Sequence, residues 1–224
     1  MTTSERSGSL TVPDEFLLLT LKDDGGAFID LPLETRRAGF VGAALMELAL
    51  QDRLDYDTTQ IWAVDPAPTG SEGLDRVLAR LSTPDLSNRS EQVIKRMIDL
   101  GEEVRDASLK RLCERGILVE AEGRVLWFLK TRRYPVTDGR EIREVKLRLL
   151  EVLLHDKLPD PRDVCLMSLA ETCGIIGEIV PQADLAAARD RLAKLARMEL
   201  IGQNVRQYLQ MLQRAMVLAI HADI

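Results

Sequence analysis

The sequence predicts a mainly α-helical protein that carries one β-hairpin. Apolar residues make up 46% of the chain and aromatic residues only 4%, and much of the apolar content is Leu and Ala, which favours helix over sheet. The segment 40–50 is almost wholly apolar and has small residues at Gly42, Ala43 and Ala44. This composition is typical of a helix that is buried on most faces and packs closely against its neighbours.

The N-terminal part is expected to hold a short helix followed by the long buried one. Residues 1–10 are polar and are expected to form a flexible tail. A helix should follow over 13–19, because a proline and two carboxylates suit the first turn of a helix. The buried helix is expected over about 33–51, and a short extended segment over 60–64.

Amphipathic patterns predict further helices on both sides of the hairpin. These helices are expected near 71–82, 88–100, 102–115, 140–156, 161–173, 182–198 and 203–222. Two β-prone runs around Glu122-Gly123 indicate a hairpin between the third and fourth of them. We find no internal repeat and no obvious linker, so residues 11–224 are expected to form a single domain.

Composition limits the class of protein. The formal net charge of −6 argues against a molecule that coats nucleic acid or an anionic membrane by bulk charge. The three cysteines cannot all pair, and their helical, apolar flanks favour buried, reduced thiols in a cytoplasmic protein. Neither a signal peptide nor a transmembrane helix is indicated, so any membrane contact is expected to be peripheral.

No pattern in the sequence points to catalysis. The chain has only two histidines, and no cluster of His, Cys and carboxylates has the spacing of metal ligands. The glycine-containing loop at 67–73 lacks the Lys-Ser/Thr ending of a phosphate-binding loop. We therefore expect no metal, no cofactor and no enzymatic activity.

The segment 124–148 is a local exception to the acidic balance, with eight basic residues against three acidic ones. It contains an apolar run next to two arginines, which suits a wedge that enters a lipid headgroup layer. The alternative is that these side chains face the core and the arginines form a solvated surface. The residues of this candidate membrane contact are Leu126, Trp127, Phe128, Leu129, Arg132 and Arg133.

Segments along nearly the whole chain resemble the Golgi phosphoprotein 3 family, also called the GPP34 domain. The matching pieces include 10–19, the run Glu47-Leu48-Ala49-Leu50 within 39–54, and the loop 65–70. They occur in the same order as in the family. The resemblance implies a mainly α fold, with a buried central helical bundle wrapped by amphipathic helices and one protruding β-hairpin.

The resemblance also implies a function and a site. Eukaryotic relatives bind phosphatidylinositol 4-phosphate on Golgi membranes and help to retain glycosyltransferases there. Their headgroup pocket uses a Trp, an Arg on the buried helix and two Arg on a later helix, at positions that fall on Pro32, Val41, Glu102 and Arg105. The resemblance thus assigns anion binding to Arg105. Arg37 is the second candidate for anion binding, because it lies one helical turn before Val41 and could direct its charge to a similar place. Such divergence is typical of a bacterial member.

We interpret the chain as a non-enzymatic peripheral membrane or adaptor protein of the cytoplasm. Its expected partner is an anionic phospholipid resembling phosphatidylinositol 4-phosphate, or the tail of a membrane protein. A second hypothesis is a winged-helix-like DNA-binding regulator, since the helix 102–115 precedes the hairpin and carries Arg105, Lys110, Arg111 and Arg115. Nucleic acid is not the expected partner, because the same helix carries four carboxylates. A third hypothesis is a protein-interaction scaffold without lipid contact.

Overall fold

The structure is a computed structural model of the chain. It describes residues 9–22, 26–83, 88–125, 129–155, 157–196, 201, 203–207 and 210. Within β3 and β4, it describes the backbone of residues 122–125 and 129–132 but not their side chains.

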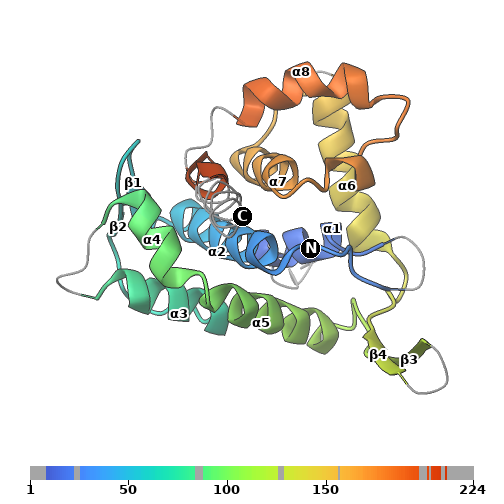
Figure 1. The fold of residues 1–224 in the computed structure, drawn as a ribbon, viewed down its shortest axis with the longest axis horizontal. Helices are drawn as coiled ribbons and strands as arrows, with labels where there is room; N and C mark the ends of the chain where they lie inside the picture. The colour runs from blue at the N-terminus through green and yellow to red at the C-terminus, as the bar shows by residue number, and fades with distance from the viewer. Residues whose placement is uncertain are drawn as a thin grey trace, which may run out of the picture.

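Helices dominate the described residues, as predicted, and the hairpin is present (Figure 1). The helices are α1 (Val12–Leu19), α2 (Leu33–Leu50), α3 (Glu72–Leu81), α4 (Ser90–Met97), α5 (Leu100–Glu114), α6 (Arg140–Leu154), α7 (Pro161–Thr172), the 3-10 helix η1 (Ile176–Glu178) and α8 (Leu185–Ala196). The strands are β1 (Leu54–Tyr56), β2 (Ile61–Ala63), β3 (Ala121–Val125) and β4 (Leu129–Arg133).

Helix α2 forms the centre of the molecule, with α3 and α5 packed on one side and α7 on the other (Figure 1). Its residues from Ala38 to Leu48 are all buried, which confirms the prediction from its apolar composition. Small residues allow the close packing: a Cβ added to Gly42 would lie 2.8 Å from Val205 Cγ2, well inside van der Waals contact. The apolar block is therefore the core around which the other helices pack.

Helix α1 is also buried along its whole length, including Asp14 and Glu15. Thr11 caps its N-terminus: the Thr11 hydroxyl accepts from the Asp14 backbone N–H, and the Asp14 carboxylate accepts from the Thr11 backbone N–H. This reciprocal pair is a capping box. The Phe16 ring meets the Phe40 ring edge to face, with centroids 5.1 Å apart, and so fixes α1 against α2.

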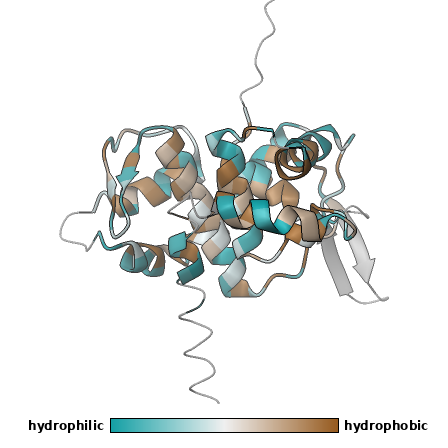
Figure 2. Cartoon of the chain, turned by 90° about the horizontal axis from the view of Figure 1, so that it is seen from above, coloured by the Kyte–Doolittle hydropathy of each residue, from teal (hydrophilic) through white to brown (hydrophobic). Residues whose placement is uncertain are grey.

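The surrounding helices are amphipathic. On α3, Leu74, Val77, Leu78 and Leu81 are buried, at the spacing expected for one helical face. Colouring by hydropathy shows hydrophilic and hydrophobic residues alternating along single helices (Figure 2). The fold thus matches the predicted arrangement of a buried central bundle wrapped by amphipathic helices.

The hairpin protrudes from the helical body next to the end of α5 (Figure 1), but its turn is not where the sequence indicated. Gly123 lies inside β3 and pairs with Thr131, so the predicted turn at Glu122-Gly123 is wrong. The observed register places Glu122 opposite Arg132. Glu-Gly is also a weaker turn former than Asn-Gly or Asp-Gly.

A second, shorter antiparallel pair, β1 and β2, follows α2. Only one of its two strands was expected, the segment 60–64. Asp52 makes the turn into β1 with a φ of 56°, a left-handed conformation that Asp tolerates better than most residues. This pair lies at one end of the long axis of the molecule, and the β3–β4 hairpin lies at the other (Figure 1).

Candidate functional site

An open cleft of about 620 Å³ lies between α5 and the base of the β3–β4 hairpin. The hairpin contributes Glu120, which precedes β3, and Tyr134, which follows β4. The segment before α2 contributes Phe28. The described residues that line the cleft are Phe28, Arg105, Asp106, Leu109, Lys110, Cys113, Glu114, Glu120 and Tyr134.

Arg105 is held against the wall of this cleft. Its guanidinium carbon lies 4.7 Å from the centroid of the Phe28 ring, within the range of a cation–π contact. The Phe28 ring in turn lies 5.7 Å from that of Tyr134. The Arg105 side chain also donates to the neighbouring Asp106 carboxylate at 3.1 Å and is 19% exposed. Arg105 therefore presents a positioned cation at the base of the hairpin.

The cleft as a whole is not strongly basic. Lys110 pairs with Glu114 at 4.0 Å, and both side chains are mostly exposed. Glu120 adds a third carboxylate to the lining. Burial raises the pKa of the Cys113 thiol, and the Glu120 and Glu114 carboxylates raise this pKa further. The electrostatic potential around Cys113 is therefore negative. An anion would bind mainly through Arg105 and would compete with Asp106 for its guanidinium.

A comparison with protein families matches residues 12–212 to the model of Golgi phosphoprotein 3 (GPP34). The chain belongs to the Golgi phosphoprotein 3 family. The match confirms the resemblance drawn from the sequence and supports an adaptor role of the Golgi phosphoprotein type. The comparison with curated proteins finds no significant match.

Glu102, which the resemblance places at one of the arginine positions of the family pocket, is bound by Arg36. Arg36 Nε donates to Glu102 Oε1 at 2.9 Å, and Arg36 Nη2 donates to Oε2 at 3.1 Å. This two-pronged hydrogen bond raises the pKa of Arg36. The charge of Glu102 is thus neutralised by Arg36 of α2.

The other predicted positions lie in different surroundings. Val41 is fully buried in the core, whereas Pro32 is exposed at the start of α2. Arg37 pairs with Glu34 and with Asp99, each at 3.3 Å, and it is not among the described residues that line the Arg105 cleft. The geometry therefore gives Arg105 and Arg37 separate partners and does not bring them into one cleft.

The predicted membrane contact falls largely outside what the structure describes. Leu126, Trp127 and Phe128 lie between β3 and β4, outside the described residues. Leu129, Arg132 and Arg133 belong to β4. Only the backbone of Leu129 and Arg132 is described, whereas the side chain of Arg133 is described and exposed. The wedge hypothesis thus stays a prediction.

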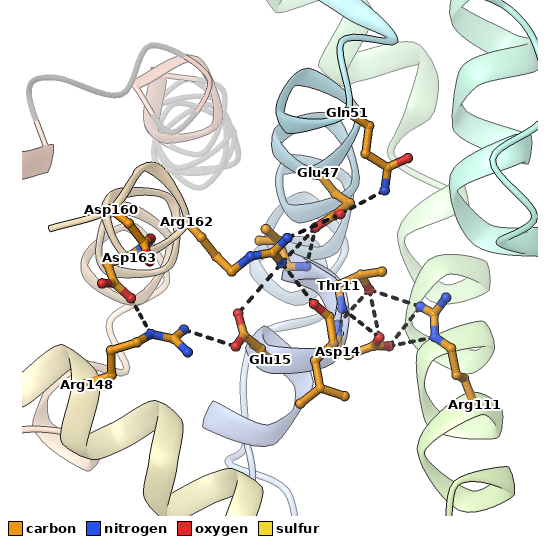
Figure 3. Close-up of polar contacts among 12 residues, drawn as sticks. Thr11, Asp14, Glu15, Glu47, Gln51, Arg111, Arg148, Asp160, Arg162 and Asp163 are labelled. Atoms are coloured by element: carbon orange, nitrogen blue, oxygen red, sulfur yellow. Dashed lines mark hydrogen bonds and ion pairs between the residues drawn. The ribbon is translucent and has the colours of Figure 1, made fainter. Parts of the chain in front are cut away.

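The sequence analysis did not predict the buried ion-pair network around α1, which we call the α1 hub (Figure 3). Four buried carboxylates on α1, α2 and α7 meet three arginines from α5, α6 and α7. The hub consists of Asp14, Glu15, Glu47, Asp163, Arg111, Arg148 and Arg162. Three of these carboxylates, on α1 and α2, lie among otherwise apolar residues.

Each arginine of the α1 hub joins helices that are distant in the sequence. Arg111 Nη2 donates to Asp14 at 2.8 Å and also to the Thr11 hydroxyl at 3.0 Å. Arg148 bridges Glu15 and Asp163, while Arg162 donates to Glu47 at 2.9 Å. The hub therefore fastens α1 to α5, α6 and α7 at once, and its role is structural.

Two further findings bear on chemistry. Among the described residues, no group of His, Cys, Asp and Glu is arranged to hold a metal ion. None of the helices in the described part of the chain combines the length and apolar composition that crossing a bilayer requires.

Proposed function

We propose that the protein is a peripheral membrane adaptor that attaches to an anionic lipid surface through the end of the molecule formed by the Arg105 cleft and the β3–β4 hairpin. The observation that carries this proposal is the place of Arg105. It lines the same cleft as Glu120 and Tyr134, the two residues that flank the hairpin strands. The retained cation of the family pocket and the basic hairpin thus share one end of the molecule.

Attachment is expected to be driven by charge more than by recognition of one headgroup. Arg105 already shares its charge with Asp106, and Glu102 is bound to Arg36. The hairpin adds Arg124, Lys130, Arg132 and Arg133, each contributing about 1 kcal/mol near an anionic surface. An apolar side chain that enters the lipid adds about 1.5–3 kcal/mol. These contributions support weak, reversible and salt-sensitive binding.

The contacts of α5 argue against the DNA-binding alternative. Arg105, Lys110 and Arg111 pair with Asp106, Glu114 and Asp14, respectively. A recognition helix needs cations that are available to phosphates. Helix α5 carries four carboxylates and three cations, so it lacks the net positive charge that a recognition helix needs beside many DNA phosphates.

The test is flotation with vesicles of phosphatidylcholine alone and with added phosphatidylserine or phosphatidylinositol 4-phosphate. The wild-type protein is expected to float with both anionic compositions and to detach as salt is raised. The double substitution Trp127→Ser with Leu129→Ser should reduce flotation at unchanged thermal stability. Leu147→Ser is the matched control, because Leu147 is 59% exposed on α6.

Two outcomes would overturn the proposal. If the wild-type protein fails to float with either anionic lipid, the hypothesis of a scaffold without lipid contact replaces the proposal. A double variant that loses thermal stability, while flotation per folded molecule is unchanged, shows that the apolar run packs in the core.

A further inference from the structure

Phe28 forms the part of the Arg105 cleft wall that the guanidinium of Arg105 contacts. The guanidinium carbon lies over the ring, 4.7 Å from its centroid. Phe28 itself is half-buried and packs against the hydrophobic core. It is not one of the pocket positions that the family resemblance assigned, and the sequence analysis did not single it out. The contact between Phe28 and Arg105 therefore asks for an explanation of its own.

The position of Phe28 is fixed from two sides. On one side, Phe28 forms an antiparallel bridge with Leu21, which follows α1. On the other side, the Tyr134 backbone N–H donates to the Gly26 carbonyl oxygen at 2.9 Å, and the Tyr134 ring lies 5.7 Å from the Phe28 ring, centroid to centroid. Tyr134 is buried. The Phe28 ring is therefore tied to the body of the molecule and offers a fixed support for a long side chain.

This support leaves hydrogen-bond donors of Arg105 available. A cation–π contact attracts the guanidinium through its positive charge, whereas an anion is bound through its N–H donors. A guanidinium carries five of these donors, and the hydrogen bond from Arg105 to Asp106 engages Nη1. Arg105 can thus stay on the Phe28 ring while other donors meet a phosphate group in a charge-assisted hydrogen bond.

The carboxylates of the cleft make a fixed guanidinium important. Asp106, Glu114 and Glu120 line the cleft together with Arg105. Without the ring, the long side chain of Arg105 would sample several rotamers, and these would bring it to competing carboxylates. A side chain that is already held in place loses less conformational entropy when an anion binds. The Phe28 ring therefore prepares Arg105 for binding.

We infer that Phe28 is a positioning residue, which holds Arg105 in the place where its guanidinium binds a phosphate group. The phosphate belongs either to a lipid headgroup or to a free ion, and the experiment below separates the two sources. This inference deepens the proposed function and rests on it, because both concern the same cation. The proposed function is tested by vesicle flotation, whereas the role of Phe28 is tested without vesicles, so either one can fail alone.

The experiment is an NMR titration of the full-length protein with inorganic phosphate and, separately, with water-soluble dioctanoyl phosphatidylinositol 4-phosphate. Phe28→Leu keeps an apolar side chain but removes the ring, so it should weaken the affinity for both probes about three- to tenfold. Phe28→Tyr keeps the ring and should bind both probes as wild type does. Tyr56→Leu is the matched control, because it removes a half-buried aromatic ring from β1, outside the cleft.

Two further readouts separate positioning from a general structural effect. The ring current of Phe28 shifts the Arg105 Nε–H resonance, so this resonance should move in ligand-free Phe28→Leu and return in Phe28→Tyr. A double-mutant cycle with Arg105→Lys gives the second readout. Because lysine lacks the planar guanidinium, Phe28→Leu should weaken phosphate binding less in the Arg105→Lys background than in wild type.

The inference is overturned if wild type binds neither probe, if Phe28→Leu binds both as tightly as wild type, or if Phe28→Leu costs the same affinity in both backgrounds. A loss confined to the lipid probe would show that the ring contacts the lipid directly, and would equally overturn it. If wild type fails to float while phosphate binding depends on Phe28 as described, the membrane attachment is rejected and the positioning role is supported.

Discussion

The α1 hub and the Arg105 cleft contain the same kinds of side chain in opposite surroundings. In the hub, the Asp14 side chain is fully buried and that of Glu15 is 6% exposed. In the cleft, the side chains of Asp106 and Glu114 are 68% and 64% exposed. The hub carboxylates have lost their water and depend on arginines, whereas the cleft carboxylates remain hydrated.

This difference explains why one group of charges is structural and the other can bind a ligand. Removing one partner from a buried pair leaves an uncompensated charge in the core, which is strongly unfavourable. An exposed pair contributes little to stability, so Arg105 can exchange Asp106 for a phosphate at small cost. The α1 hub therefore fixes the helices that position the cleft, and the cleft is free to exchange partners.

The largest expected effect is in the α1 hub. Arg148→Met keeps most of the apolar stem but leaves Glu15 and Asp163 without this cation, so the free energy of unfolding should fall by about 3–5 kcal/mol. Arg76→Met is the control, because Arg76 pairs with Glu72 and Glu103 on the surface, and its free energy of unfolding should stay close to that of wild type. Urea unfolding measures both. Equal losses in the two variants would contradict the distinction between hub and surface.

The α1 hub also shows which contacts could not be predicted from the sequence. Asp14 and Glu15 were assigned only to the positive end of a helix dipole, a local interpretation. Their partners Arg111 and Arg148 lie 97 and 133 positions away, and no local pattern links residues at such separations. Glu47, a lone carboxylate in an apolar run, was the one visible sign that a buried charge needed a partner.

Helix boundaries show a similar limit. The long apolar pattern of α2 gave its bounds to within one residue. The predicted helices 88–100 and 102–115, in contrast, left Gly101 between them, because glycine usually ends or weakens a helix. The structure places Gly101 inside α5, where an added Cβ would lie 2.3 Å from the Arg37 carbonyl oxygen. Glycine is there for a close approach of two helices, which only the folded structure reveals.

The second effect concerns binding at the Arg105 cleft. Arg105→Glu should weaken the affinity for sulfate or phosphatidylinositol 4-phosphate by about 1.5–3 kcal/mol, the range for a hydrogen bond to a charged group. The free energy of unfolding should change by less than about 1 kcal/mol, since the lost ion pair with Asp106 is exposed on the Asp106 side. Isothermal titration and urea unfolding measure the two quantities.

Arg105→Lys sharpens this test. Lysine keeps the charge but lacks the planar guanidinium that lies over the Phe28 ring, so its affinity should fall between those of wild type and Arg105→Glu. Unchanged affinity in Arg105→Glu would mean that this chain does not use the headgroup site of its family.

The smallest effect is a change in how stability depends on pH, and it again separates the α1 hub from the cleft. Burial raises the pKa of Glu15, although Arg148 and Arg162 lower it in part. The folded protein thus holds the Glu15 proton to a higher pH than the unfolded chain does. As pH rises from about 4.5, the unfolded value, through the folded pKa, the unfolded chain releases this proton first. Glu15 therefore lowers stability across that window, by at most about 1.4 kcal/mol per pH unit.

Glu15→Gln removes this titration while keeping a polar side chain of similar size. Its free energy of unfolding, measured in urea between about pH 4 and pH 7, should therefore decline less with rising pH than that of wild type. Glu114→Gln is the matched control, because the Glu114 side chain is 64% exposed in the cleft, and its pH profile should parallel that of wild type. If the Glu15→Gln and wild-type profiles run parallel instead, the surrounding arginines offset the burial of Glu15 fully, and the α1 hub tolerates its charges as well as the surface does.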